Sequence, residues 1–316
     1  MEVKEINGYT LLAPFHNKNA GFSRWTFGRR DGREYFLKEF QDPVFPDDQT
    51  LSFNLRQHRI RECVEFERRK FRLYDALSQA SDGNLVRPVE FFRWGAHYYL
   101  ATERIVGEDL TMEDVARLPW QERLTLCRAA AHALMQCHKA GVVHSDIKQT
   151  NLILQRTPNG KLTAKLIDFD AAFFEDEPPQ EEEELYFDQL YLAPEGCCFL
   201  LGEPVELNCK MDVFSMGLLM HQYLTGDMPY YDEGYSFPHE AVLDGRSLQL
   251  DPSLPRELRD ILTGMLRADP EERSTMEEVY QDLGIYFPVK RPAEPVHPDG
   301  PTADSMGGYF RVAGDL

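Results

Sequence analysis

Four polar side chains in the centre of the chain have the types and spacing that phosphoryl transfer requires. Asp146, Lys148 and Asn151 lie between two apolar runs, and Asp168 follows a short strand-like run. A carboxylate such as Asp146 can accept or orient the proton of an attacking hydroxyl, and the ammonium group of Lys148 can offset developing negative charge. Carboxylate and amide oxygens are the ligands that Mg²⁺ prefers, so Asp168 and Asn151 are candidate metal ligands.

The first third of the chain predicts β-strands and one long helix. Apolar and polar residues alternate there, and the Asp31–Gly32 pair predicts a hairpin turn. A charged segment over 50–80 carries Phe66, Leu73 and Leu77 at helical spacing. The expected strands are 9–14, 22–29, 34–40, 86–92 and 97–103.

From Gly107 onward the pattern becomes helical. The expected helices cover 119–140, with Pro119 in its first turn, 211–226, which is apolar nearly all round, 258–266 and 275–283. Ser274 is the expected N-cap of the last of these helices. A strand-rich part followed by a helical part indicates the α+β class.

The order of these motifs resembles the eukaryotic-like (Hanks-type) serine/threonine protein kinase superfamily, over most of residues 10–285. HSDIKQTN is similar to its catalytic loop, DFD stands where the family has D-F-G, and APE, which ends at Glu195, matches outright. The resemblance implies a bilobal protein-kinase-like fold, with a five-stranded antiparallel N-lobe that carries one helix and a mainly helical C-lobe. The implied boundaries are 1–104 for the N-lobe, 105–287 for the C-lobe and 288–316 for a Pro- and Gly-rich tail, either disordered or docking.

The resemblance also implies how a nucleotide would be bound. Lys38, in YFLKEF, would grip the phosphates, and Glu67 in the long helix would be its ion-pair partner, with Glu65 and Glu62 as alternatives. The segment YYLATERIVGEDL resembles the hinge between the lobes. Its implied nucleotide contacts are the gatekeeper Thr102, the backbones of Glu103 and Ile105 at the adenine ring, and Asp109 at the ribose.

Two further residues would hold the C-lobe in place. Asp212 resembles the aspartate that pins the catalytic loop through backbone hydrogen bonds. Arg273 resembles the arginine that pairs with the glutamate of APE, here Glu195.

The sequence departs from the family pattern in its phosphate loop. HNKNAGFSR contains Gly21 alone among glycines, although Asn17 and Asn19 tolerate positive φ better than most residues. Asn19 and Gly21 are therefore the expected phosphate-binding positions of this loop.

The activation segment departs further. Ser145 replaces the arginine that couples activation-segment phosphorylation to the site in the family, and no Ser or Thr lies between Asp168 and Glu195. The acidic run 181–184 is either a solvated loop, a selector of basic substrates or the occupant of a basic patch of the protein itself. Asp170, in place of glycine, would stiffen the D-F-x hinge, and Asp188 would either pair with Lys148 or point to solvent.

The resemblance implies an ATP-dependent protein serine/threonine kinase, with Mg²⁺ or alternatively Mn²⁺ as its metal, that needs no activation-loop phosphorylation on Ser or Thr. One rival is a nucleotide-binding pseudokinase or scaffold, which the poor glycine loop motivates. Another is a small-molecule kinase, against which Lys148, Glu195 and Arg273 count.

Composition and charge limit the class of protein, its location and its partners. The net charge is −19, with 42% hydrophobic and 28% charged residues, which indicates a globular chain and argues against nucleic-acid binding. The N-terminus has no apolar run typical of a signal peptide, and we expect a cytoplasmic protein without a membrane span.

The expected partner is a protein substrate, and the negative net charge is compatible with a basic substrate. The run around 23–46 resembles bacterial kinases, some encoded beside phosphatase or von Willebrand A-type proteins, which are candidate signalling partners.

Overall fold

The computed structural model describes residues 5–18, 23–46, 51–180 and 188–287. The chain divides into two units, residues 1–286 and 287–316. The first unit holds every element described below. The expected lobe boundary after residue 104 and the expected character of the tail stay predictions, the latter outside the described residues.

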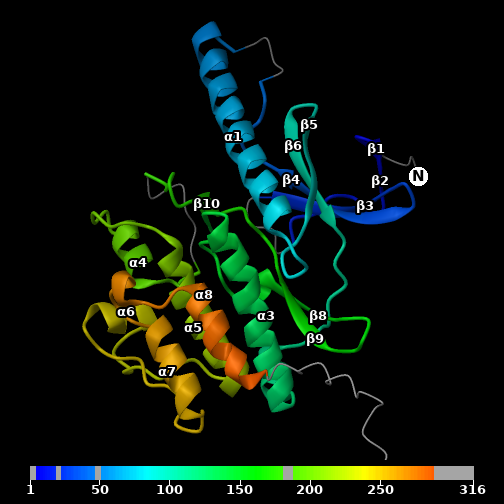
Figure 1. Cartoon of the computed structure of the whole chain (residues 1–316). Coiled ribbons are helices and arrows are strands. Elements are labelled where there is room, and N and C mark those ends of the chain that lie inside the picture. Colours follow the sequence, from blue (N-terminus) through cyan, green and yellow to red (C-terminus); the bar gives the residue numbers. More distant parts are fainter. Residues whose placement is uncertain (1–4, 19–22, 47–50, 181–187, 288–316) are drawn as a thin grey trace, which may run out of the picture. The chain divides into compact units, whose positions relative to one another are not determined.

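An antiparallel sheet of six strands forms the N-lobe, with the order β1-β2-β3-β4-β6-β5 (Figure 1). The expectation of five strands was wrong by one, because Asn7 and Gly8 form a hairpin turn that adds a short first strand. Both residues have positive φ, 47° and 79°, as an Asn-Gly hairpin turn requires. The strands are β1 Glu5–Ile6, β2 Tyr9–Leu11, β3 Ser23–Arg30, β4 Arg33–Phe40, β5 Pro88–Trp94 and β6 His97–Glu103.

One long helix, α1 Phe53–Ala80, packs on this sheet. The Ser52 hydroxyl caps it by accepting the backbone N–H of Leu55 at 3.4 Å. Aromatic rings join the helix to the sheet, and the Phe66 ring of α1 lies 5.4 Å from Phe40 and 5.2 Å from Tyr98. The helix therefore presents one face to the residues at the end of β4.

The C-lobe is mainly helical and is built around α5. This helix is buried over most of its circumference, as its sequence predicts, and Gly226 with φ of 97° ends it. The last helix is capped by Thr275 rather than the expected Ser274, because the Thr275 hydroxyl and the Glu278 carboxylate form a capping box. The helices are α2 Met112–Arg117, α3 Trp120–Lys139, α4 Pro194–Leu200, α5 Cys209–Thr225, α6 Pro238–Leu243, α7 Arg256–Met265 and α8 Met276–Asp282, with short 3₁₀ turns η1 Gln149–Asn151, η3 Pro270–Glu272 and η4 Leu283–Tyr286.

Two small antiparallel sheets hold the loops between these helices. β7 Val142–Val143 pairs with β10 Phe173–Phe174, and β8 Leu152–Arg156 pairs with β9 Leu162–Leu166. These pairings hold the segments that follow β7, precede β8 and follow β9, which contain the candidate residues Asp146, Asn151 and Asp168. Among the helices that the structure describes, none is long and apolar enough to cross a bilayer.

The environment of His221, in α5, indicates that acidification lowers the free energy of unfolding. Its Nδ1–H donates to the carbonyl of Asp227 at 2.7 Å, while Nε2 accepts the backbone N–H of Asp251 at 3.1 Å, so the neutral ring satisfies both contacts. Burial lowers the pKa of His221 in the folded chain. The unfolded chain thus binds the proton better, and this stabilisation is full above pH about 6.5 and falls below it.

We therefore expect the free energy of unfolding of the wild type to drop more than that of His221→Gln between pH 7.5 and 5.5. Denaturant titrations at both pH values measure this difference. An equal drop in wild type and His221→Gln would contradict the assignment.

Candidate active site

Asp212 holds the catalytic loop from the first turn of α5. Its buried carboxylate accepts the backbone N–H of His144 at 2.7 Å and that of Ser145 at 2.8 Å, so the expected pinning of the loop is confirmed. Ser145 has a φ of 63°, a left-handed conformation that is strained for a residue with a side chain. Its hydroxyl also donates to the carbonyl of Ala171 at 2.7 Å, which joins the catalytic loop to the start of the activation segment.

The β8–β9 hairpin brings the two candidate metal ligands to the same place. Leu152 and Leu166 are partners in its register, and the Ile167 N–H donates to the Asn151 carbonyl at 2.9 Å. Asn151 is therefore held beside Ile167, the residue directly before Asp168, although 16 residues separate Asn151 from Asp168 in the sequence.

Asp146, Lys148 and Asn151 form one hydrogen-bonded group. The Asn151 side-chain amide donates to the Asp146 carbonyl at 2.7 Å and to its Oδ2 at 2.9 Å. Lys148 Nζ lies 2.8 Å from the same Oδ2 and 4.0 Å from Asp188, so Asp146 is the nearer of its two partners. Asp146 Oδ1 is buried and has no hydrogen-bond partner within the described residues.

Lys38, on β4, lies between two carboxylates. Its Nζ is 2.8 Å from Asp168 Oδ1 and 2.6 Å from Asp170 Oδ2. Burial by itself lowers the pKa of Lys38, but the charges of Asp170 and then Asp168 outweigh it and raise that pKa. Burial likewise works against ionisation of Asp168, and Lys38 overcomes it, so the pKa of Asp168 is lowered.

The expected pairing of Lys38 with Glu67 is not the one that the structure forms. Glu67 accepts the Tyr98 hydroxyl at 2.7 Å. Glu65 and Glu62 are exposed and pair with basic neighbours on α1 itself. In the part of the chain that the structure describes, Lys38 is therefore paired with Asp168 and Asp170 and with no acid of α1.

Lys70 is the residue of α1 that reaches the site, and sequence reasoning missed it. Its side chain is buried, and its Nζ donates to the Asp170 carbonyl at 3.1 Å. Burial lowers the pKa of Lys70, and the charge of Asp170 partly offsets this effect. A signal was available, because Lys70 lies on the same helical stripe as the apolar Phe66, Leu73 and Leu77.

The oxygens of this site fit a hard cation. Asn151 donates through its amide nitrogen, so its Oδ1 is left without a partner among the described residues, and so is Asp168 Oδ2. Asp168 itself has a φ of 63°. The described residues contain no group of three His, Cys, Asp or Glu that could hold a metal alone. One carboxylate and one amide oxygen match Mg²⁺ that is shared with substrate phosphates.

The structure describes some, but not all, of the residues that we expect to contact the nucleotide. Thr102 is buried in β6, opposite Phe36 of β4. The Glu103 N–H donates weakly to the Arg87 carbonyl at 3.4 Å, and its carboxylate pairs with Lys165. Ile105 makes no backbone hydrogen bond to a described residue, and Asp109 is exposed. Asn19 and Gly21 lie outside the described residues.

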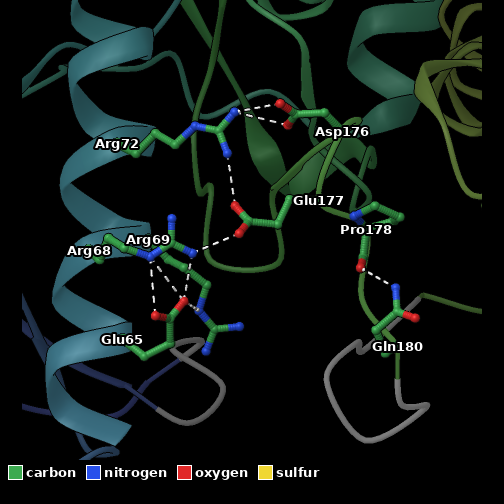
Figure 2. Close-up of polar contacts among 8 residues, drawn as sticks. All are labelled: Glu65, Arg68, Arg69, Arg72, Asp176, Glu177, Pro178 and Gln180. Carbon is green, nitrogen blue, oxygen red and sulfur yellow. Dashed lines mark hydrogen bonds and ion pairs between the residues drawn. The ribbon is translucent and has the colours of Figure 1, made fainter. Parts of the chain in front are cut away.

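Acidic residues of the activation segment contact arginines of α1, as Figure 2 shows. Arg72 lies 2.9 Å from Asp176 and 2.8 Å from Glu177, and Arg68 lies 2.7 Å from Glu177. The Arg72 guanidinium also stacks 3.7 Å from the centre of the Phe174 ring. The hypothesis that acids of this segment occupy a basic patch thus has a counterpart here, while the run 181–184 lies outside the described residues.

The expected ion pair between Arg273 and Glu195 is confirmed. Arg273 is fully buried, and its two Nη atoms lie 2.6 and 3.1 Å from the Glu195 carboxylate oxygens. Its remaining N–H groups donate to backbone carbonyls, at 3.0 Å for that of Arg267 and 2.6 Å for that of Lys210. The end of the activation segment is therefore anchored to the turn before α8.

A family model described as the protein kinase domain matches residues 55–283, more than half of the chain. The chain belongs to the protein kinase domain family. The antiparallel N-lobe, the helical C-lobe and the Asp146–Asn151–Asp168 arrangement agree with that membership.

Similar curated proteins are serine/threonine and calcium-dependent protein kinases. The chain is 30% identical to serine/threonine-protein kinase ULK3 of Xenopus laevis, over 61% of this chain and 41% of that protein. It is 28% identical to ULK3 of Homo sapiens, over 65% and 46%, and 30% identical to calcium-dependent protein kinase 15 of Oryza sativa subsp. japonica, over 62% and 36%. The chain thus spans less than half the length of these relatives, and they give no support to the expected bacterial subgroup.

Replacing Arg273 by lysine should destabilise the fold strongly. Lysine keeps the charge but cannot make the paired contacts to Glu195 and the carbonyl contacts at once. We expect a loss of about 3 kcal/mol in the free energy of unfolding, measured by denaturant titration. Arg267→Lys, at a half-exposed arginine paired with Glu272, is the matched control and changes stability by less than about 1 kcal/mol. A loss below about 1 kcal/mol for Arg273→Lys would rule out this anchoring role.

Proposed function

We propose that this chain is a protein serine/threonine kinase that transfers the γ-phosphoryl group of ATP to a protein hydroxyl with the help of Mg²⁺. The observation that carries the proposal is Oδ1 of Asp146, which is buried and has no hydrogen-bond partner among the described residues, beside an Oδ2 that Lys148 and Asn151 hold in place. An acceptor oriented in this way is suited to an incoming hydroxyl.

Each residue then has a physical role. Asp146 accepts the hydroxyl proton as the oxygen–phosphorus bond forms and the bond from the γ-phosphorus to the bridging oxygen of ADP breaks. Lys148 offsets charge at the transferred group, and Lys38 orients the phosphates. Bound Mg²⁺, held by Asn151 and Asp168, would neutralise phosphate charge.

A protein substrate is favoured over a small molecule by the surroundings of Asp146. A small pocket beside it is lined by the catalytic loop, Asp188 and residues 191–193, which directly precede the anchored Glu195. A substrate hydroxyl that enters this pocket would come close to Asp146. The similarity to serine/threonine-protein kinases ULK3 of Xenopus laevis and Homo sapiens supports the same class. A basic substrate, a cytoplasmic location and a phosphatase or von Willebrand A-type partner stay predictions from the sequence.

Asp146→Asn tests the chemical role directly. It should lower kcat for phosphate transfer to a generic basic protein at least about 100-fold, because the acceptor for the hydroxyl proton is lost. Asp168→Ala should in addition weaken Mg²⁺-dependent binding of a fluorescent ATP analogue. Asp75→Asn, an exposed change on α1, is the control for both assays. An unchanged kcat in Asp146→Asn would refute the assignment. If the wild-type protein binds the nucleotide but transfers no phosphate, the pseudokinase alternative is favoured.

We also propose that activity does not depend on phosphorylation of Ser or Thr in the activation segment. Ser145 stands where an arginine would read such a phosphate, and its hydroxyl contacts the Ala171 carbonyl instead. Asp176 and Glu177 supply negative charge to Arg68 and Arg72, as a phosphate bound by arginines would (Figure 2). The carboxylates are part of the chain, so this contact needs no modification.

Removing the ion pairs of Arg68 and Arg72 should therefore slow the enzyme, whereas phosphatase treatment should leave its rate unchanged. We expect Arg68→Gln/Arg72→Gln to lower kcat/KM about threefold to tenfold, since the ion pairs are exposed and individually weak. Arg59→Gln/Arg61→Gln, at exposed positions of the same helix, is the matched control. Treating the wild type with a broad-specificity phosphatase should leave its rate unchanged, and a phosphatase-induced loss of activity would overturn the proposal.

A further inference from the structure

We propose that Asp170 is the positioning residue for Lys38, in place of an acid on helix α1. The inference rests on the proposed kinase function, in which Lys38 orients the phosphates. In protein kinases generally, the lysine on the third strand is held by a glutamate of the long N-lobe helix. Here the acid comes from the activation segment instead, two residues beyond Asp168.

The contacts around Asp170 come from three elements of the N-lobe. Its Oδ2 lies 2.6 Å from Lys38 Nζ on β4, and accepts the hydroxyl of Ser23 on β3 at 3.3 Å. Its backbone carbonyl accepts Lys70 Nζ of α1 at 3.1 Å. Asp170 is thus held by side chains on both of its polar groups, and its carboxylate is fixed against the lysine amine.

Among the described residues, the acids paired with Lys38 are Asp168 and Asp170, and none comes from α1. Glu67 is engaged by Tyr98, and the residue of α1 that turns toward the site is the cation Lys70. A protonated Lys70 would repel the Lys38 ammonium group, and Asp170 contacts both side chains. The two buried amines thus contact different groups of Asp170, with Lys38 at its carboxylate and Lys70 at its backbone carbonyl.

Asp170 also gives Lys38 a partner that does not compete for the metal. In the structure, Asp168 and Asp170 both contact the Lys38 amine. Asp168 is the candidate metal ligand, and its carboxylate is needed by Mg²⁺ when nucleotide is bound. Asp170 can then keep Lys38 in position, which explains why a carboxylate stands where the family has glycine.

The test compares Asp170→Asn and Asp170→Gly with the conservative Asp170→Glu. Asp170→Asn keeps the shape and removes the charge, and Asp170→Gly decides the outcome should the asparagine variant not fold. Two readouts are needed: kcat/KM with ATP as the varied substrate, and the rate at which an amine-reactive reagent labels Lys38 in nucleotide-free protein, followed by mass spectrometry. Asp75→Asn is the matched control.

We expect Asp170→Asn and Asp170→Gly to lower kcat/KM for ATP at least about tenfold and to speed Lys38 labelling at least about threefold. Asp170→Glu should restore most of both values, and Asp75→Asn should match the wild type. A purely structural role would shift the melting temperature without a specific change at Lys38.

Both kcat/KM and Lys38 labelling within twofold of the wild type in Asp170→Asn would overturn the inference. Its failure is distinguishable from failure of the proposed function. In the latter case the wild type itself transfers no phosphate, while the labelling of Lys38 in nucleotide-free protein still shows whether Asp170 holds the amine.

Discussion

The neutralisation of the buried Lys38 ammonium group is the interaction on which the rest of the site depends. An unpaired ammonium group at this depth would be strongly unfavourable, so carboxylates must lie against it. Asp168 and Asp170 meet this requirement, and in doing so they fix the start of the activation segment against β4. The ion pairs therefore join the sheet of the N-lobe to the segment that carries the candidate metal ligand.

The other side of the site depends on backbone geometry rather than on charge neutralisation. Asp212 accepts two consecutive backbone N–H groups and so holds Ser145 in its left-handed conformation. The β8–β9 register then fixes Asn151 next to the segment leading to Asp168. Asn151 holds one carboxylate oxygen of Asp146, and the other oxygen has no partner in the part of the chain that the structure describes, which is the feature that the proposed chemistry uses.

Much of this arrangement could be predicted from the sequence because it depends on local order. Strands β4 and β6 and helix α5 follow from periodicity and the catalytic loop from motif spacing, whereas Asp212 and Arg273 were correctly assigned from the resemblance to the family. The short strand β1 was missed although the Asn7–Gly8 turn signalled it. The cap of α8 was misplaced by one residue, because Ser274 and Thr275 are both good caps and only the position of Glu278 decides between them.

The partner of Lys38 could not be predicted in the same way. A helix turns by about 100° per residue, so an error of a few residues in register moves a different side chain to the site. Glu67 was chosen for its charge, whereas Lys70 shares the buried stripe with Phe66 and Leu73. The contacts of Asp170 and of Arg72 join residues about 100 or more positions apart, and no local pattern encodes them.

The most direct test of the account is a crystal structure of the full chain with Mn²⁺ and a non-hydrolysable ATP analogue, with the metal located by its anomalous signal. The account predicts a metal peak about 2.2 Å from Asn151 Oδ1 and from the Asp168 carboxylate, with Lys38 on the phosphates and still beside Asp170. A metal peak away from Asn151 and Asp168, or a nucleotide that leaves Lys38 without a phosphate contact, would contradict it.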